Sequence, residues 1–267
     1  RVLHSLSFID DPTRIVRAAR FEQRLGFHLE PRTESLIAPA LPMLGRITGE
    51  RIRSELTLLL REPTPEISLR RLQERGVLTA IHPALHMNNA MTTLIERIRS
   101  VTSPVPGLTF DLPGIYWQVL ATTMQPSDAE SLCDRLMIPR GARTSIVQAA
   151  RLAPELHRWV SDGLLISEIV NLLDQYDELA LLACWIATDS PAERRLIEQH
   201  LLSWRHIKPD TDGHRLKAMG LKPGPCYKRI LERLRAGRLD GEIKTAEQEL
   251  QRLQSLIDEG ICDDDVP

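Results

Sequence analysis

The chain has 267 residues, enough for one large domain or two to three small ones, and its 42% hydrophobic content can supply a core. Its formal net charge of −2 excludes a polycation, so any contact with nucleic acid must come from local basic patches. No apolar run of 18 residues and no signal-peptide pattern is present, so we expect no membrane span. The four cysteines form no C-x-x-C pair, which predicts a reduced, cytoplasmic setting without structural zinc.

The segment 8–26 predicts a helix with an arginine face. Asp11 suits the N-cap, Pro12 suits the first helical position, and Gly26 can end the helix in a left-handed conformation. Four arginines fall within an arc of roughly 120°, and no acidic residue along that face offsets their repulsion. This favours a face that receives an anion, while the alternative is a solvated surface helix. The arginines are Arg14, Arg17, Arg20 and Arg24.

The run from Asp10 to Phe21 resembles the E-D-x-x-R neck motif of class II tRNA nucleotidyltransferases, the CCA-adding enzymes and their bacterial poly(A) polymerase relatives. Residues 1–60 look like this family throughout, and residues 212–245 look like its C-terminal tail. The family's leading glutamate is Asp10 here, one methylene shorter. The resemblance implies a nucleotide-binding site that consists of Asp11, Arg14, Arg17, Arg20 and Asp10.

The resemblance places Asp11 and Arg14 against the Watson–Crick edge of the incoming nucleotide. Asp only accepts hydrogen bonds and Arg only donates them. Adenine and cytosine present an amine donor beside a ring-nitrogen acceptor, whereas guanine and uracil present the reverse order. Such a pair would accept ATP and CTP and reject GTP and UTP without a template. Asp11 therefore has two candidate roles, helix cap and base reader.

The family's catalytic head carries G-G-x-x-R-D, an Asp-x-Asp metal pair and R-R-D, and we find none of these motifs here. Asp210-Thr-Asp212 has the D-x-D form but is more typical of a cap or turn. Because the chain begins at Arg1, we expect a fragment whose head lies upstream in the same polypeptide. The resemblance then implies two-metal phosphoryl transfer with Mg²⁺ held by that head, no catalytic or metal-binding residue in this chain, and inactivity of the chain alone.

The rest of the chain predicts helices and no strand, so the fold class is all-α, with a multi-helix neck, body and tail. We expect three segments: a neck over 1–62, a helical body over 63–137, and a body and tail over 138–267. Within the neck and the body that follows it, a helix is expected from Pro31 to Ala38, another over Gly49–Leu60 after Thr48, and a third after Thr64 that ends before Gly76.

The body contains several further local signals. His82 and His86 are predicted to pack or cap rather than bind metal. Residues 102–114 predict a loop because they contain three prolines and two glycines. Helices are also expected over 140–161 and 164–187, and capping boxes are expected to open helices at Ser127 and Ser190. A last helix is expected from Thr245 to Gly260, capped by Thr245 and Gln248.

A basic stretch follows, with eight Lys or Arg residues and one acidic residue between positions 214 and 238. Gly220 should end one helix and Pro223-Gly-Pro225 should begin the next, which gives a tight helical hairpin. It resembles helix-hairpin-helix phosphate binders and the tail that holds tRNA in the family. The alternative is a structural hairpin with solvated charges. The expected RNA contacts are Lys222, Gly224, Lys228 and Arg229.

We therefore interpret the chain as the nucleotide-selecting and RNA-binding part of an enzyme that adds AMP, with CMP left open, to tRNA or other RNA 3′ ends. Whether its product is CCA, a terminal A or a poly(A) tail is left open. The competing interpretation is a non-catalytic helical RNA-binding or scaffold module.

Overall fold

A computed structural model describes the backbone of residues 2, 4–104, 106 and 112–262. All regular elements in this part of the chain are helices, which confirms the all-α prediction. Within the same part, no helix is both long and apolar enough to cross a membrane. The chain forms two compact units, one of Arg1–Leu156 with Tyr176–Pro191 and one of His157–Gln175 with Ala192–Pro267. The three-segment division by sequence remains a prediction.

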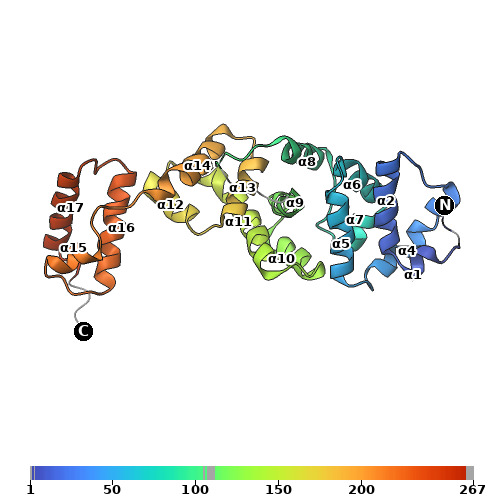
Figure 1. The fold of residues 1–267 in the computed structure, drawn as a ribbon, viewed down its shortest axis with the longest axis horizontal. Coiled ribbons are helices and arrows are strands. Elements are labelled where there is room, and N and C mark those ends of the chain that lie inside the picture. Colours follow the sequence, from blue (N-terminus) through green and yellow to red (C-terminus); the bar gives the residue numbers. More distant parts are fainter. Residues whose placement is uncertain (1, 3, 105, 107–111, 263–267) are drawn as a thin grey trace. The chain divides into compact units, whose positions relative to one another are not determined.

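Most of the helices of the first unit precede residue 136, and the colours of Figure 1 follow them along the chain from blue to green. They are α1 (Ser7–Asp10), α2 (Thr13–Leu25), α3 (Pro31–Glu34), α4 (Ile37–Leu44), α5 (Gly49–Leu60), α6 (Pro65–Glu74), α7 (Val77–Ile81), α8 (Asn89–Ser100), α9 (Leu112–Ala121), α10 (Pro126–Arg135) and α13 (Glu178–Ala187). The boundary between the units falls within α11 (Arg140–Asp162) and at the first residue of α14 (Pro191–Leu202). The second unit holds α12 (Ile166–Leu173), η1 (Trp204–His206), α15 (Gly213–Ala218), α16 (Pro225–Leu239) and α17 (Ala246–Asp258).

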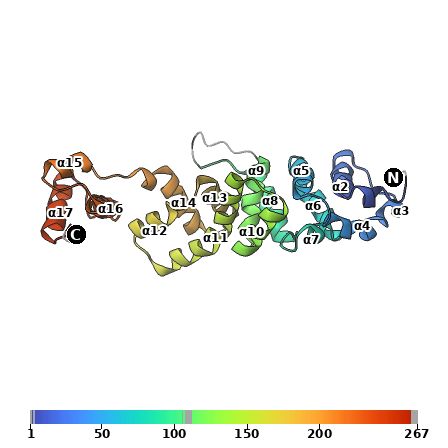
Figure 2. The ribbon, with the colours of Figure 1, turned by 90° about the horizontal axis from the view of Figure 1, so that it is seen from below.

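Helix α2 lies beside α5 and α6 (Figures 1 and 2). Ile15 and Ala19 are fully buried on the side opposite the arginines, as an amphipathic helix requires. The helix begins at Thr13, and Pro12 precedes it with helical dihedrals, so the predicted start is confirmed to within one residue. Gly26 ends it at φ 65°, the left-handed conformation that was expected.

The start of α5 lies against the end of α10. A Cβ atom at Gly49 would stand 2.0 Å from the carbonyl oxygen of Arg135, so only glycine fits this approach. The Arg135 guanidinium donates to the carbonyls of Leu44, at 2.7 Å, and Ile47, at 3.2 Å. Arg53 donates to the Leu136 carbonyl at 2.9 Å. These bonds fix the turn that ends α10 on the start of α5.

Several predicted boundaries agree with the structure. Helix α5 covers Gly49–Leu60 as expected, although the Thr48 side chain makes no capping bond. Helix α6 begins at Pro65, and Gly76 follows its end at φ 72°. In the tail, Thr245 and Gln248 form the reciprocal capping box at the start of α17. Helix α14 begins at Pro191, directly after Ser190.

Other predicted boundaries are wrong. The structure has two helices, α3 and α4, where one helix was expected from Pro31 to Ala38, and they are separated at Ser35 and Leu36. The helix expected over 164–187 is interrupted at 174–177, where Asp177 caps α13 by accepting from the Ala180 amide at 2.8 Å. Ser127 lies inside α10 because Pro126 already occupies its first position. The predicted loop at 102–114 falls in part outside the described residues, and α9 begins within it, at Leu112.

The second unit has its own apolar core between α15, α16 and α17, which Figure 1 shows packed together. Leu216, Ile230, Leu234 and Leu253 are fully buried in it. Cys226 and Cys262 form a disulfide with their Cα atoms 5.1 Å apart. The expectation of reduced cysteines is therefore wrong for this pair, because the fold brings together residues that are 36 apart in sequence.

Candidate functional site

The loop between α1 and α2 positions the Asp11 carboxylate through one of its two oxygens. Oδ1 accepts from the Thr13 hydroxyl at 2.6 Å and from the Thr13 amide at 3.3 Å, which is the expected capping role. The same oxygen accepts from the Arg51 guanidinium at 3.0 Å. The nearest recorded partner of Oδ2 is Arg14 Nε at 3.8 Å, too far for a hydrogen bond. Asp11 thus caps α2 with Oδ1 and keeps Oδ2 as an acceptor.

Asp11 is a carboxylate at neutral pH. Burial by itself would raise its pKa, but the hydrogen bonds from Thr13 and the charges of Arg51 and Arg14 outweigh burial and lower the pKa. An ionised carboxylate accepts hydrogen bonds and donates none. The free oxygen can therefore bind an amine but repels a carbonyl oxygen.

The Arg14 guanidinium lies next to Asp11 and is held from α1. Its Nη1 donates to the Ser7 hydroxyl at 2.9 Å, and Ser7 itself is buried. This leaves Nη2 as a donor, and the side chain is 45% exposed. The structure thus brings together an acceptor, Asp11 Oδ2, and a donor, Arg14 Nη2. The hydrogen bonds that hold these side chains use other atoms, Asp11 Oδ1 and Arg14 Nη1.

The other two predicted nucleotide-binding arginines have partners on or just after α5. Arg17 pairs with Glu55, and this hydrogen bond is the largest of the effects that raise the Arg17 pKa. Arg20 pairs with Glu62 at 3.3 Å, with both side chains only 11% exposed. The acids that offset these two arginines lie in a distant segment rather than along the arginine face, so the sequence did not reveal them. Arg17 remains 44% exposed.

The other two charged residues singled out in this segment, Asp10 and Arg24, are on the surface. Asp10 is the last residue of α1 and its side chain is exposed. Arg24 is exposed in the last turn of α2 and lines a cleft with Arg61. No sequence pattern indicated Ser7 and Arg51, which position Arg14 and Asp11, because both contacts depend on the tertiary packing of α1 and α5.

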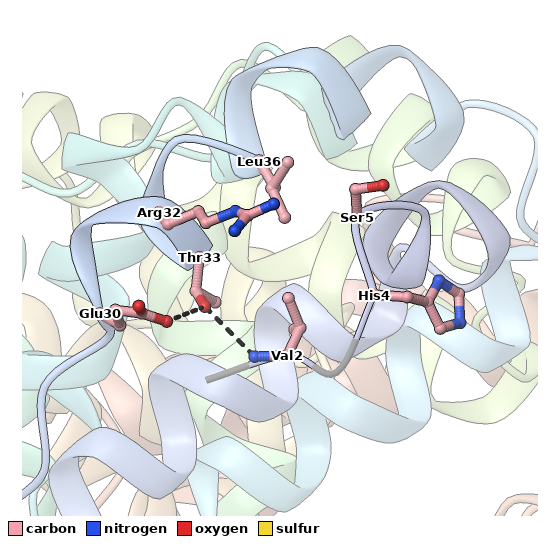
Figure 3. A pocket seen from close by; sticks show the side chains of 7 residues that line it. All are labelled: Val2, His4, Ser5, Glu30, Arg32, Thr33 and Leu36. Carbon is pink, nitrogen blue, oxygen red and sulfur yellow. Dashed lines mark hydrogen bonds between the residues drawn. The ribbon is translucent and has the colours of Figure 1, made fainter.

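A small pocket near the start of the chain has a volume of about 240 Å³ and lies between the first residues and α3 (Figure 3). The Thr33 hydroxyl lies at its base, where it accepts from the Val2 amide at 3.2 Å and contacts Glu30. Figure 3 shows the Arg32 and His4 side chains on different walls of the pocket. Since Asp11 and Arg14 do not line it, this pocket is separate from the candidate site.

The basic stretch of the tail divides into arginines that are bonded within the fold and charges that are exposed. Three arginines are engaged within the fold: Arg229 donates to the Ile261 carbonyl at 2.8 Å, Arg235 to Asp174 at 2.6 Å, and Arg238 pairs with Glu249 and Asp210. The other basic residues of the stretch, including Lys222 and Lys228, are exposed.

At the predicted RNA contacts, Gly224 precedes α16 in an extended conformation, and Lys228 lies 3.7 Å from Glu232. Arg229 holds the end of the chain after α17, so the predicted phosphate contact is available from Lys222 and Lys228 rather than from Arg229.

The candidate metal ligands have structural roles. Among the described residues, no group of three or more His, Cys, Asp or Glu is placed to hold a metal ion. Asp212 of the D-x-D sequence caps α15 by accepting from the Arg215 amide at 2.9 Å. His82 is buried against the Ser131 hydroxyl at 3.0 Å, and burial lowers its pKa, as expected for a packing histidine.

Comparison with known proteins gives matches along nearly the whole chain. A family model described as a probable RNA and SrmB-binding site of polymerase A matches residues 26–89. An A-adding tRNA nucleotidyltransferase from Geobacter sulfurreducens is 31% identical over 97% of this chain. The solved Thermotoga maritima CCA-adding enzyme complexed with tRNA is 28% identical over 96% of the chain, with a TM-score of 0.73. A CCA-adding enzyme in complex with ATP is also 28% identical, with a TM-score of 0.74.

The chain is similar to tRNA nucleotidyltransferases along nearly its whole length, which confirms the resemblance to that family seen in its sequence. It spans 31% of the length of the Geobacter relative and 64% of the Thermotoga enzyme. The family model covers a segment that the sequence did not single out for RNA, from the end of α2 to the start of α8.

Proposed function

We propose that this chain selects the incoming nucleotide and holds the RNA in a nucleotidyltransferase that adds AMP to tRNA or other RNA 3′ ends in the cytoplasm. ATP is the proposed substrate, and CTP remains open because the similar proteins include both A-adding and CCA-adding enzymes. The described residues supply no metal site. We therefore assign Mg²⁺ and the transfer step to a region outside this chain, which corresponds to the part of the relatives that the chain does not span. The isolated chain is then inactive.

The observation that carries this proposal is that the two carboxylate oxygens of Asp11 have different roles. Because Oδ1 accepts the capping and Arg51 bonds, Oδ2 can accept from a base amine without loss of the fold. Arg14 lies beside it with a donor to spare. An acceptor next to a donor matches the amine and ring nitrogen of adenine or cytosine, and it opposes guanine and uracil. Arg17, which is 44% exposed on the same face, is the proposed further nucleotide contact, whereas Arg20 is paired with Glu62 and is only 11% exposed.

Asp11→Asn tests this role in the complete protein that carries the chain. An Asn side chain can place its oxygen where Oδ1 caps the helix, and Asn caps helices as well as Asp does. Its amide nitrogen then replaces Oδ2, so that a donor faces the base. We expect the unfolding temperature to stay near that of the wild type, while discrimination of ATP against GTP and UTP falls about tenfold or more, the effect of a donor–acceptor mismatch of ~1–3 kcal/mol.

The measurement is single-nucleotide incorporation with each of the four nucleotides. Wild-type rates and wild-type exclusion of GTP and UTP in Asp11→Asn would show that Asp11 is only a cap. That result would favour the alternative of a helical RNA-binding or scaffold module.

For the tail, we propose that Lys222, Lys228 and the backbone at Gly224 hold RNA phosphates. The double variant Lys222→Glu/Lys228→Glu should weaken RNA binding and flatten its salt dependence by about 0.7–0.9 in log–log slope for each lost phosphate contact. Arg229 is left unchanged because it holds the Ile261 carbonyl. Unchanged affinity and slope would make the hairpin structural only.

A further inference from the structure

A second cleft lies on the arginine side of α2, at the end distant from Asp11. It has a volume of about 560 Å³ and lies between the last turn of α2 and the segment that joins α5 to α6. The Gln23 side-chain amide donates to the Thr64 hydroxyl at 3.0 Å, which connects α2 to the segment that joins α5 to α6. The lining consists of Gln23, Arg24, Arg61, Glu62, Pro63 and Thr64.

The charge of this cleft is not balanced. Its one acid, Glu62, is already paired with Arg20, which lies underneath with little exposure. Arg24 and Arg61 are both exposed, and neither side chain has a partner within the described part of the chain. The cleft therefore presents two guanidinium groups, each with donors free, around a space open to solvent.

The lining selects for phosphate rather than for a base. It contains no aromatic side chain on which a base could stack, and Pro63 is its one apolar residue. Guanidinium groups bind phosphate with paired hydrogen bonds. Arg61 to Thr64 also fall within residues 26–89, where the matched family model is described as a probable RNA-binding site. These observations favour the backbone of an RNA strand.

The distance along α2 is consistent with a strand that passes both sites. Arg14 and Arg24 are ten residues apart on one face, which corresponds to about 15 Å at 1.5 Å per residue. A strand covers this length in roughly four nucleotides at 3.4 Å each. We propose that Arg24 and Arg61 bind a backbone phosphate of the RNA a few nucleotides from the 3′ end that receives the new nucleotide. This rests on the proposed function.

The test compares two double variants of equal charge change. Arg24→Gln/Arg61→Gln removes both guanidinium groups of the cleft, and Arg140→Gln/Arg195→Gln removes two exposed arginines outside residues 26–89. Binding of a tRNA acceptor-stem hairpin with a single-stranded 3′ end is followed by fluorescence anisotropy between 50 and 300 mM salt. We expect the cleft variant to bind about tenfold more weakly, with a log–log salt slope reduced by roughly 1.4–1.8 for two contacts. The control should change little.

Two further measurements assign the phosphate. ATP binding should be equal in both variants, and loss of ATP binding with intact RNA binding would instead place a nucleotide phosphate in the cleft and overturn the proposal. Equal losses of RNA affinity in the cleft and control variants would also overturn it, because bulk charge would then be sufficient. Base discrimination, measured as for Asp11→Asn, should stay at the wild-type level in the cleft variant, so failure of the Asp11 role and failure of the cleft remain distinguishable.

Discussion

Gly49→Ala should destabilise the first unit, because the start of α5 has no space for a methyl group. The new Cβ would lie 2.0 Å from the Arg135 carbonyl oxygen and 2.9 Å from the carbonyl carbons of Arg135 and Leu136. These are backbone atoms, and the turn that contains them is bonded to Leu44 and Ile47 through Arg135. Either the helix or this turn has to move by about 1 Å, which is an overpacking cost of ~1–3 kcal/mol.

In the interior of a helix, alanine is more favourable than glycine by roughly 0.5–1 kcal/mol. This gain applies to interior positions, where it would offset part of the overpacking cost. Since Gly49 is the first helical residue, we expect a net loss of about 2 kcal/mol, near the upper part of the overpacking range. For a unit of this size that corresponds to roughly 4–8 °C in melting temperature. Thermal unfolding followed by circular dichroism measures it.

Gly141→Ala is the matched control, because Gly141 lies in the first turn of α11 and a Cβ atom there would meet nothing within 4 Å. Its melting temperature should equal or slightly exceed that of the wild type. If Gly49→Ala is as stable as Gly141→Ala, the close approach of α5 to α10 does not constrain this position.

The remaining prediction concerns acid stability and the buried His200. Burial, together with the nearby charges of Arg205, Arg235 and His206, lowers the pKa of His200 to about 4, although Asp174 opposes this. The unfolded chain then binds the proton near pH 6.5 and the folded chain only near pH 4, so unfolding free energy should fall as the pH drops through this window, by ~2 kcal/mol between pH 7 and pH 5. Urea unfolding at both pH values should show this loss in the wild type and a smaller one in His200→Gln; an equal loss in both would mean that another group titrates.

The sequence predicted the helix ends that depend on local chemistry. Asp11, Asp212 and Thr245 each bond to an amide two or three residues ahead, so their capping is a property of a few adjacent residues. Gly26 and Gly76 are left-handed because the chain must turn directly after a helix. Such features can be read from a short window.

Features that depend on tertiary packing could not be read in this way. The ion pair between Asp174, just after α12, and Arg235 of α16 is one example. The Cys226–Cys262 disulfide is another, because the packing of α17 against α16 brings the two residues together. The candidate site combines both kinds of feature: the Asp11 cap is local, whereas its Arg51 partner comes from α5.

A count of basic residues does not show which of them can bind a ligand, and the reason is physical. A guanidinium group whose donors are used within the fold, as in Arg238, is costly to withdraw, because its partner Glu249 would be left buried without its counter-charge. Arg24 and Arg61 pay no such cost when a phosphate arrives, and Arg14 keeps a donor while Ser7 holds the rest of its side chain. The sites that can take a ligand are therefore those with donors and acceptors that the fold positions but does not use, and Asp11 Oδ2 meets the same condition for an acceptor.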